Sequence, residues 1–203
     1  MGNRRAVQAE ATRSEVVAAA RELFLARGYV RTSLGAVAEQ AGVAVQTIYN
    51  AVGNKAALLA AVLDEATAGP GAPRSAAEFM QERAGASGGG IPGLSTLLAD
   101  WIADVNVRST EIQTLIQQTA AVYPEVAALE RERGARRRAG FVQAASVART
   151  RGGLAGGASD EQVAAAIWSL GHPLVFSSLV VDGDWSADAY RQWLAQSLRS
   201  VLS

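Results

Sequence analysis

The stretch from residue 32 to residue 59, TSLGAVAEQAGVAVQTIYNAVGNKAALL, decides the fold. Ser33 is a good N-cap, because its hydroxyl can accept from the free N–H groups of the following turn. Gly42 can end this first helix in the left-handed conformation. Between them the apolar residues keep helical spacing: Leu34, Val37, Ala38 and Ala41. A short second helix is expected from about Ala44 to Ala51, and a third from Lys55. This layout predicts a helix-turn-helix, whose second helix enters the DNA major groove.

The short helix has an outer face suited to DNA. Ile48 and Val52 are spaced to face inward, which leaves five side chains on or near the outside: Val45, Gln46, Thr47, Tyr49 and Asn50. Gln and Asn can pair with adenine, and Thr can meet a thymine methyl group. Asn54 can cap the helix that starts at Lys55, the only lysine in the chain. Free N–H groups and the helix dipole favour an anion there, so Lys55 is predicted to contact a DNA phosphate.

A further amphipathic helix is expected before this motif, over residues 12–27. Its apolar stripe consists of Val16, Ala20, Leu23 and Phe24, and Gly28 ends it. The N-terminal unit therefore reads as a three-helix DNA-binding module, and a fourth helix leaves it.

Residues 16–59 resemble the tetracycline-repressor (TetR) family of bacterial transcription regulators. The matching residues are Ala19-Ala20, Leu23-Phe24, Gly28-Tyr29, Thr32-Ser33, Val37-Ala38, Ala41-Gly42-Val43, Thr47-Ile48-Tyr49, Asn54-Lys55 and Leu58-Leu59. The resemblance implies a homodimer, with a DNA domain followed by an all-α ligand-binding and dimerisation domain. It also implies repression that a small molecule relieves. Two positions depart from the family pattern. Ala44 stands where a Ser cap is frequent, and Ala51-Val52 replaces a common His-Phe pair.

The resemblance implies that Gln46, Thr47, Tyr49, Asn50 and Lys55 touch DNA. The full predicted DNA-binding set is Thr32, Ser33, Ala44, Val45, Gln46, Thr47, Tyr49, Asn50 and Lys55. Its predicted partner is a palindromic double-stranded operator. We expect residues 1–55 to form the DNA-binding domain, and residues 56–203 to form the ligand-binding and dimerisation domain.

Composition restricts the class of protein. The 203 residues include no cysteine, which excludes disulfides, thiol nucleophiles and thiolate metal sites. The net charge is zero, yet residues 1–55 carry seven basic and four acidic groups. This local balance of +3 has the sign expected of a DNA-binding surface. No apolar run is long enough for a bilayer, so we expect a soluble cytoplasmic protein without a membrane partner.

The rest of the chain also reads as helical, which makes the fold class all-α. Breakers at residues 69–73 place the domain junction there or just before, and a short helix is possible over residues 74–87. Further helices are expected at about residues 94–106, 110–122, 124–151, 159–181 and 186–202. The last two are apolar on much of their circumference, which predicts dimerisation through them. The alternative is that they are interior to a monomer.

Two features of this half have competing interpretations. Gly171-His172-Pro173 should kink the penultimate helix. The kink can open a ligand pocket lined by Trp101, Tyr123, Trp168, His172 and Phe176, or these side chains can be plain core. In the run from Arg131 to Arg138, Glu and Arg are interspersed at helical spacing, which usually gives a solvated face. A second nucleic-acid patch or an anionic-ligand site is the alternative.

These patterns favour a ligand-responsive DNA-binding regulator, a repressor that an unknown small-molecule effector releases from its operator. A ligand-independent DNA-binding regulator is the first alternative, and an all-α enzyme is the second. For the enzyme the sequence offers no metal-ligand spacing, no Ser-His-acid set and no phosphate-binding Gly loop. We therefore expect no enzymatic activity, no cofactor and no metal.

Overall fold

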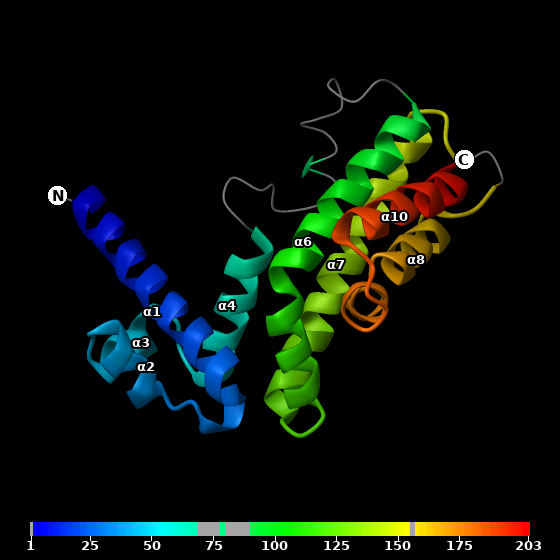
Figure 1. The fold of residues 1–203 in the computed structure, drawn as a ribbon. Coiled ribbons are helices and arrows are strands. Elements are labelled where there is room, and N and C mark those ends of the chain that lie inside the picture. Colours follow the sequence, from blue (N-terminus) through cyan, green and yellow to red (C-terminus); the bar gives the residue numbers. More distant parts are fainter. Residues whose placement is uncertain (1, 69–77, 80–89, 155–156) are drawn as a thin grey trace. The chain divides into compact units, whose positions relative to one another are not determined.

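Helices account for the regular structure in the computed structural model, which describes residues 2–68, 78–79, 90–154 and 157–203 (Figure 1). Side chains are described from residue 6 onward within these ranges. The predicted all-α class is confirmed. The chain divides into two compact units. Unit 1 comprises residues 1–67 and 111–131, and unit 2 comprises residues 68–110 and 132–203. The junction predicted at residues 69–73 and most of the helix predicted at 74–87 lie outside the described residues. The functional boundary after residue 55 stays a prediction.

Unit 1 begins with the predicted helix-turn-helix and its flanking helices. They are α1 (Gly2–Arg31), α2 (Leu34–Ala41), α3 (Val45–Ala51) and α4 (Lys55–Ala68). α1 starts at Gly2 rather than near residue 12, so the sequence-based start was wrong. Gly28 interrupts α1, as predicted, with φ 77° and ψ 166°. Only glycine adopts this conformation readily.

Capping residues set the helix ends of unit 1 where the sequence predicts them. The Ser33 hydroxyl accepts from the Ala36 N–H at 3.1 Å at the start of α2. Gly42 ends α2 with φ 66°, and its N–H donates to the carbonyls of Ala38 and Glu39. The Asn54 side chain accepts from the Ala57 N–H at 2.8 Å at the start of α4. α3 begins at Val45, and its N-cap residue Ala44 provides no side-chain cap.

The core of unit 1 holds these helices together. Its fully buried side chains come from α1 to α4 and from the parts of α6 and α7 that belong to this unit: Val16, Ala20, Phe24, Val37, Ile48, Leu58, Leu59, Val62, Ile112 and Val126. Burying an aliphatic or aromatic side chain of this kind stabilises a fold by roughly 1.5–3 kcal/mol. The predicted stripes of α1 and α2 therefore face the core.

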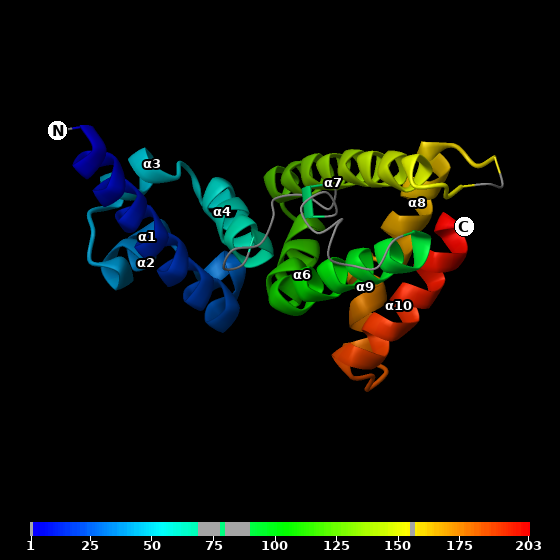
Figure 2. The same cartoon turned by 90° about the horizontal axis from the view of Figure 1, so that it is seen from above.

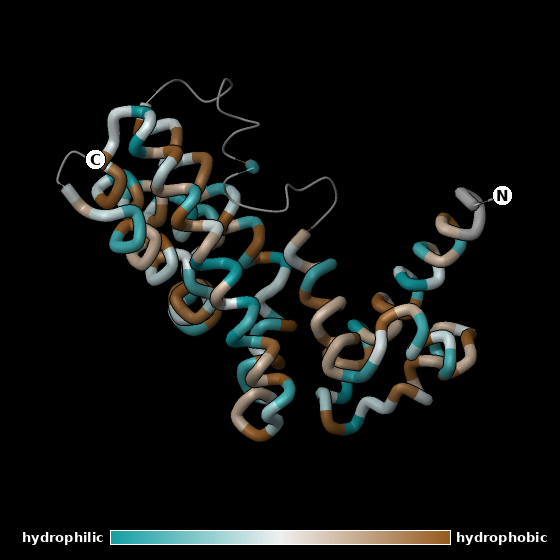
Figure 3. Tube along the Cα trace, turned by 180° about the vertical axis from the view of Figure 1, so that it is seen from behind, coloured by the Kyte–Doolittle hydropathy of each residue, from teal (hydrophilic) through white to brown (hydrophobic). Residues whose placement is uncertain are grey.

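The other helices lie wholly or partly in unit 2 (Figures 1 and 2). They are α6 (Ile91–Ala120), α7 (Pro124–Thr150), α8 (Asp160–Leu170), α9 (Pro173–Phe176), a π-helical turn η1 (Ser177–Val181) and α10 (Ala187–Leu202). α6 and α7 contribute residues to both units. α8 and α10 lie side by side. The core of unit 2 includes Leu98, Ile102, Phe141, Ile167 and Tyr190. Hydrophobic and hydrophilic residues are mixed along the helices of both units (Figure 3).

α6 is one helix, whereas the sequence predicted two with a break between residues 106 and 110. Polar residues suggested that break, since Asn, Ser and Thr side chains often compete with the helix backbone. Here they bond within the helix or across the core. The hydroxyl of Ser109 donates to Val105 O and that of Thr110 to Asn106 O, both at 2.6 Å. The Asn106 amide donates to Gly171 O at 3.2 Å.

The predicted kink at Gly171-His172-Pro173 is confirmed. α8 ends at Leu170, α9 begins at Pro173, and the imidazole Nδ1 of His172 accepts from the Leu174 N–H at 3.2 Å. The sequence was expected to hold no apolar run of bilayer length, yet among the described residues one segment, Asp160–Val181, is long and apolar enough to cross a membrane by length and composition. This break interrupts the segment, and core helices of soluble proteins have the same composition.

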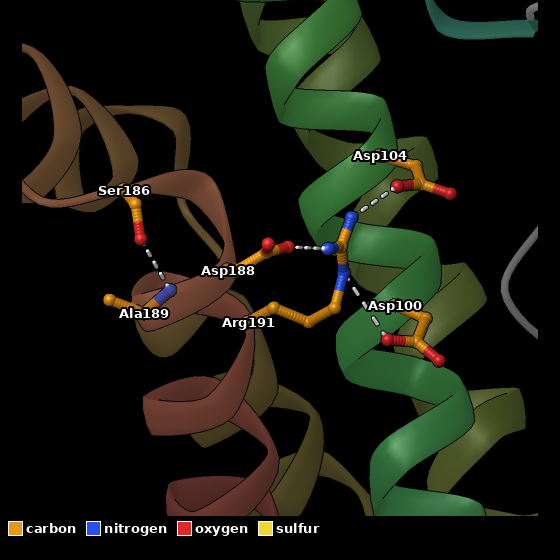
Figure 4. A network of polar contacts seen from close by, with 6 residues as sticks. All are labelled: Asp100, Asp104, Ser186, Asp188, Ala189 and Arg191. Atoms are coloured by element: carbon orange, nitrogen blue, oxygen red, sulfur yellow. Dashed lines mark hydrogen bonds and ion pairs between the residues drawn. The ribbon is translucent and has the colours of Figure 1, made fainter.

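An arginine links α10 to α6 within unit 2 (Figure 4). Nη2 of Arg191 lies 2.7 Å from Oδ1 of Asp104, and Nε lies 3.3 Å from Oδ1 of Asp100. Nη1 lies 2.6 Å from Oδ1 of Asp188 on its own helix. A network of this kind fixes the position of α10 more firmly than a single exposed ion pair, which is worth little.

Candidate nucleic-acid interface

α3 presents the outer face that the sequence predicts. Ile48 is fully buried beneath it, whereas Gln46 and Asn50 are exposed and Tyr49 retains 51% of its accessible surface. Val45 is exposed as well, and Thr47 is half-buried. The amide Nε2 of Gln46 donates to Oδ1 of Asn50 at 3.1 Å, one helical turn away. The two amides therefore form one polar surface, with donors and acceptors suited to base edges.

Lys55 lies at the start of α4, and part of its side chain is buried. Its ammonium lies 4.2 Å from the centroid of the Tyr29 ring, and Nζ donates to Val30 O at 3.5 Å. Burial lowers the pKa of Lys55, and the negative charge of Glu125 acts in the opposite direction. A cation over an aromatic face is attracted by the ring quadrupole. The Tyr29 ring therefore positions the predicted phosphate-binding charge.

Tyr29 is a site residue that the sequence reasoning missed. Its ring stacks on Phe24 at 5.7 Å and meets the edge of Tyr123 at 5.5 Å, so aromatic packing fixes it from two sides. Burial raises the pKa of Tyr29, and the neighbouring Glu125 and Tyr123 raise it further. The sequence offered one signal for this role: an aromatic residue directly follows the helix-breaking Gly28, in a module whose only lysine needs a partner that positions it.

Thr32 and Ser33 have structural duties. Thr32 is 1% exposed, and its hydroxyl is placed to donate to Leu23 O at 3.1 Å and to Gly28 O at 2.9 Å. Ser33 is exposed and caps α2. Ala44 is exposed at the uncapped start of α3. Contacts of these three residues with DNA stay predictions.

The five residues predicted to line a ligand pocket do not all lie in one unit. Tyr123 belongs to unit 1, where it packs against Tyr29. Trp101, Trp168 and Phe176 pack in the core cluster of unit 2, and His172 meets Trp168 edge-on at 4.9 Å. Nε1 of Trp101 is buried and has no hydrogen-bond partner among the described residues. The structure thus brings four of the five residues to one unit.

Residues 16–62 match the sequence model of the family described as bacterial regulatory proteins, tetR family. The chain carries a TetR-family DNA-binding domain. The match covers α1 from Val16, all of α2 and α3, and α4 as far as Val62. It therefore includes every residue of the predicted DNA-binding set.

Solved structures extend the likeness in fold beyond the TetR-family domain. NalD, the secondary repressor of the MexAB-OprM multidrug efflux pump in Pseudomonas aeruginosa, is 22% identical with a TM-score of 0.70. The alignment covers 96% of this chain and 98% of NalD. A TetR-family regulator from Rhodococcus sp. is 18% identical with a TM-score of 0.72, over 95% of this chain and 98% of that one. Salmonella enterica GusR is 18% identical with a TM-score of 0.68, over 94% and 95%. Among curated proteins, none has a sequence that matches this chain.

Proposed function

We propose that the protein is a cytoplasmic, homodimeric transcriptional repressor that binds a palindromic operator and leaves it when a small molecule binds unit 2. The observation that carries the DNA-binding part is the exposed face of α3. Gln46, Tyr49 and Asn50 point outward over a buried Ile48, and a positioned Lys55 follows at the next helix start. Structural packing gives no reason for this combination.

The proposed division of labour follows from the chemistry of each side chain. Gln46, Thr47 and Asn50 read base edges, which supplies sequence discrimination. Lys55 and Tyr49 bind phosphate oxygens, which sets the position of the domain on the duplex. The N-terminus of α4 adds backbone N–H groups and its dipole to the charge of Lys55.

Dimerisation is proposed through the region of α8 to α10. Within the apolar segment Asp160–Val181, only 33% of an 18-residue window is buried within one chain. Leu174, Val181 and Trp185 expose 54%, 58% and 38% of their accessible surface. A soluble monomer rarely leaves apolar residues this concentrated in water, and a twin subunit would cover them. Two-fold symmetry would then offer two α3 helices to half-sites roughly 34–36 Å apart.

Release by a ligand is the third part of the proposal. It is supported by the aromatic cluster of unit 2 and by the likeness in fold to NalD, the secondary repressor of a multidrug efflux pump. A ligand can release the operator only as far as its affinities for the two conformations differ. Operator DNA must then weaken ligand binding by the same factor.

DNA binding is tested with labelled fragments from the regions that flank the gene, by fluorescence anisotropy with excess random duplex. We expect one fragment to bind at least about 10³-fold more tightly than random DNA. A protein that binds all fragments alike would contradict the proposal. Screening small molecules for release of that fragment, and then measuring ligand affinity with and without operator, tests the regulation. Equal ligand affinities would contradict induction while leaving DNA binding intact.

A further inference from the structure

A cation lies partly buried in unit 2 without a carboxylate partner. Arg137 belongs to the Arg-rich run of α7, and its side chain points toward the end of α8. Nη2 lies 3.4 Å from Gly171 O and 3.5 Å from Oδ1 of Asn106. Among the described residues, no carboxylate oxygen lies within 4.0 Å of the guanidinium. Burial lowers the pKa of Arg137 to about 10, so it remains charged at neutral pH.

A structural duty explains only part of this arrangement. Gly171 O stands at the C-terminal end of α8, where a helix dipole presents about half a negative charge. Both hydrogen bonds are at the long end of the range, and a guanidinium has five N–H donors. Most of the N–H donors of Arg137 are therefore left for another partner. The run from Arg131 to Arg138 was expected to form a solvated face, yet the side chain of Arg137 faces inward.

The groups around Arg137 set the charge and polarity of the site. Burial and the charge of Arg137 lower the pKa of His172 below its usual 6.5, so His172 is neutral at pH 7. Burial raises the pKa of Tyr190 to about 12, so its hydroxyl stays protonated. These two neutral groups do not offset the charge of Arg137, and the guanidinium of the exposed Arg138 lies near the same Trp168 ring, at 5.4 Å. Trp168 lies 5.6 Å from the guanidinium of Arg137 and provides an apolar wall beside it.

We propose that unit 2 binds a monovalent organic carboxylate with an apolar body, whose carboxylate pairs with the guanidinium of Arg137 and whose body lies against Trp168. This proposal rests on the proposed ligand response and names the chemical class of the effector. A carboxylate matches the fork of a guanidinium and can accept two of its N–H groups. A monoanion matches the charge of Arg137, the partly buried one of the two guanidinium groups near Trp168.

Isothermal titration of the full-length protein with octanoate and octanamide tests the proposal, because the two probes share their alkyl chain and differ in charge. We expect octanoate to bind at least about tenfold more tightly than octanamide. The Arg137→Gln variant should lose this preference. Arg138→Gln is the matched control, since Arg138 is the next residue and also lies over the Trp168 ring, at 5.4 Å, but is exposed. It should retain the preference.

Three results would overturn the proposal. They are equal affinity for octanoate and octanamide, an equal loss in Arg137→Gln and Arg138→Gln, and no binding by any saturated carboxylate from hexanoate to dodecanoate. If circular dichroism shows that Arg137→Gln does not fold, the affinities of the unmodified protein for octanoate and octanamide test the proposal on their own. Release of operator DNA is measured separately. Octanoate that binds through Arg137 without releasing DNA would support the carboxylate site and contradict ligand-controlled repression.

Discussion

Lys55 is held in place within unit 1 before any DNA is bound. Its ammonium lies over Tyr29 and its charge is faced by Glu125, so little side-chain freedom is left to lose on binding phosphate. Lys55→Ala should weaken binding to specific and random DNA alike. The slope of log K against log salt should become shallower by about 1 for each lost phosphate contact. Lys55→Arg, which keeps the charge, is the control. An unchanged slope in Lys55→Ala would refute the phosphate contact.

Gln46 should act differently, because its amide can read a base edge. Gln46→Ala should relax discrimination at particular operator positions, at a cost of about 1–3 kcal/mol per half-site. The bond from Gln46 to Asn50 suggests that Asn50→Ala affects neighbouring positions of the same half-site. Affinities for a set of operators with single base changes measure the effect. Equal weakening on every operator would mean that Gln46 contacts only the backbone.

Single residues also show where sequence reasoning stops. Ser33, Gly42 and Asn54 could be predicted because capping depends on the local chain alone. The inward orientation of the Thr32 and Arg137 side chains could not be predicted. Whether a hydroxyl or guanidinium between two helices points inward depends on segments distant in sequence, such as Gly171 for Arg137. The outward face of α3 was predictable because its spacing around Ile48 is local.

At the scale of a helix, two glycines should respond to alanine in opposite directions. Gly28 has φ 77° and ψ 166°, and an added Cβ would meet nothing within 4 Å. Gly28→Ala should therefore destabilise unit 1 through backbone strain alone, by about 1–3 kcal/mol. Gly35 lies inside α2, where a Cβ would make an ordinary 3.7 Å contact with Ser33 Oγ. Gly35→Ala should stabilise by about 0.4–1 kcal/mol. Urea unfolding followed by circular dichroism measures both, and effects of the same sign would contradict this reasoning.

The break between α8 and α9 should make stability depend on pH. The folded pKa of His172 lies below 6.5, so the unfolded chain binds a proton more readily. Protonation of His172 in the unfolded chain therefore lowers the free energy of unfolding as pH falls through 6.5 toward the folded pKa. His172→Asn keeps a capping acceptor for the Leu174 N–H but does not titrate. Unfolding free energies of both proteins from pH 7.5 to 5.5 should diverge, and the native protein should lose more. Parallel curves would rule out this role.

Helix boundaries were predictable wherever burial is periodic. Residues 2–11 of α1 have no apolar stripe, and residues 6–11 are exposed, so no burial pattern marks that start. Inside α6, polar Asn106 and Ser109 suggested a loop, yet long-range and in-helix bonds satisfy them. Helix propensity and distant partners decided these two cases, and neither leaves a periodic signal.

At the scale of the whole molecule, the proposed dimer can be separated from folding. Leu174→Asp places a charge at a residue that is 54% exposed in one chain, so a monomer should tolerate it. In the dimer that charge would be buried without a partner. We expect sedimentation as a monomer at micromolar concentration, together with weaker operator binding. Val122→Asp, at a residue of unit 1 that is 72% exposed, should remain a dimer. A dimeric Leu174→Asp protein would place the interface elsewhere.

The position of Lys55 also has an analytical consequence, because no other side chain in the sequence carries a primary amine. A lysine-specific endoprotease can cut the chain at one bond, at the start of α4, and so separates α1 to α3 from everything that follows. Amine-directed dyes and acetylating agents likewise have one side chain to modify, and the lowered pKa of Lys55 increases its reactivity. Because DNA on the α3 face would cover that amine, the yield of cleavage or of labelling at Lys55 itself reports the fraction of molecules bound.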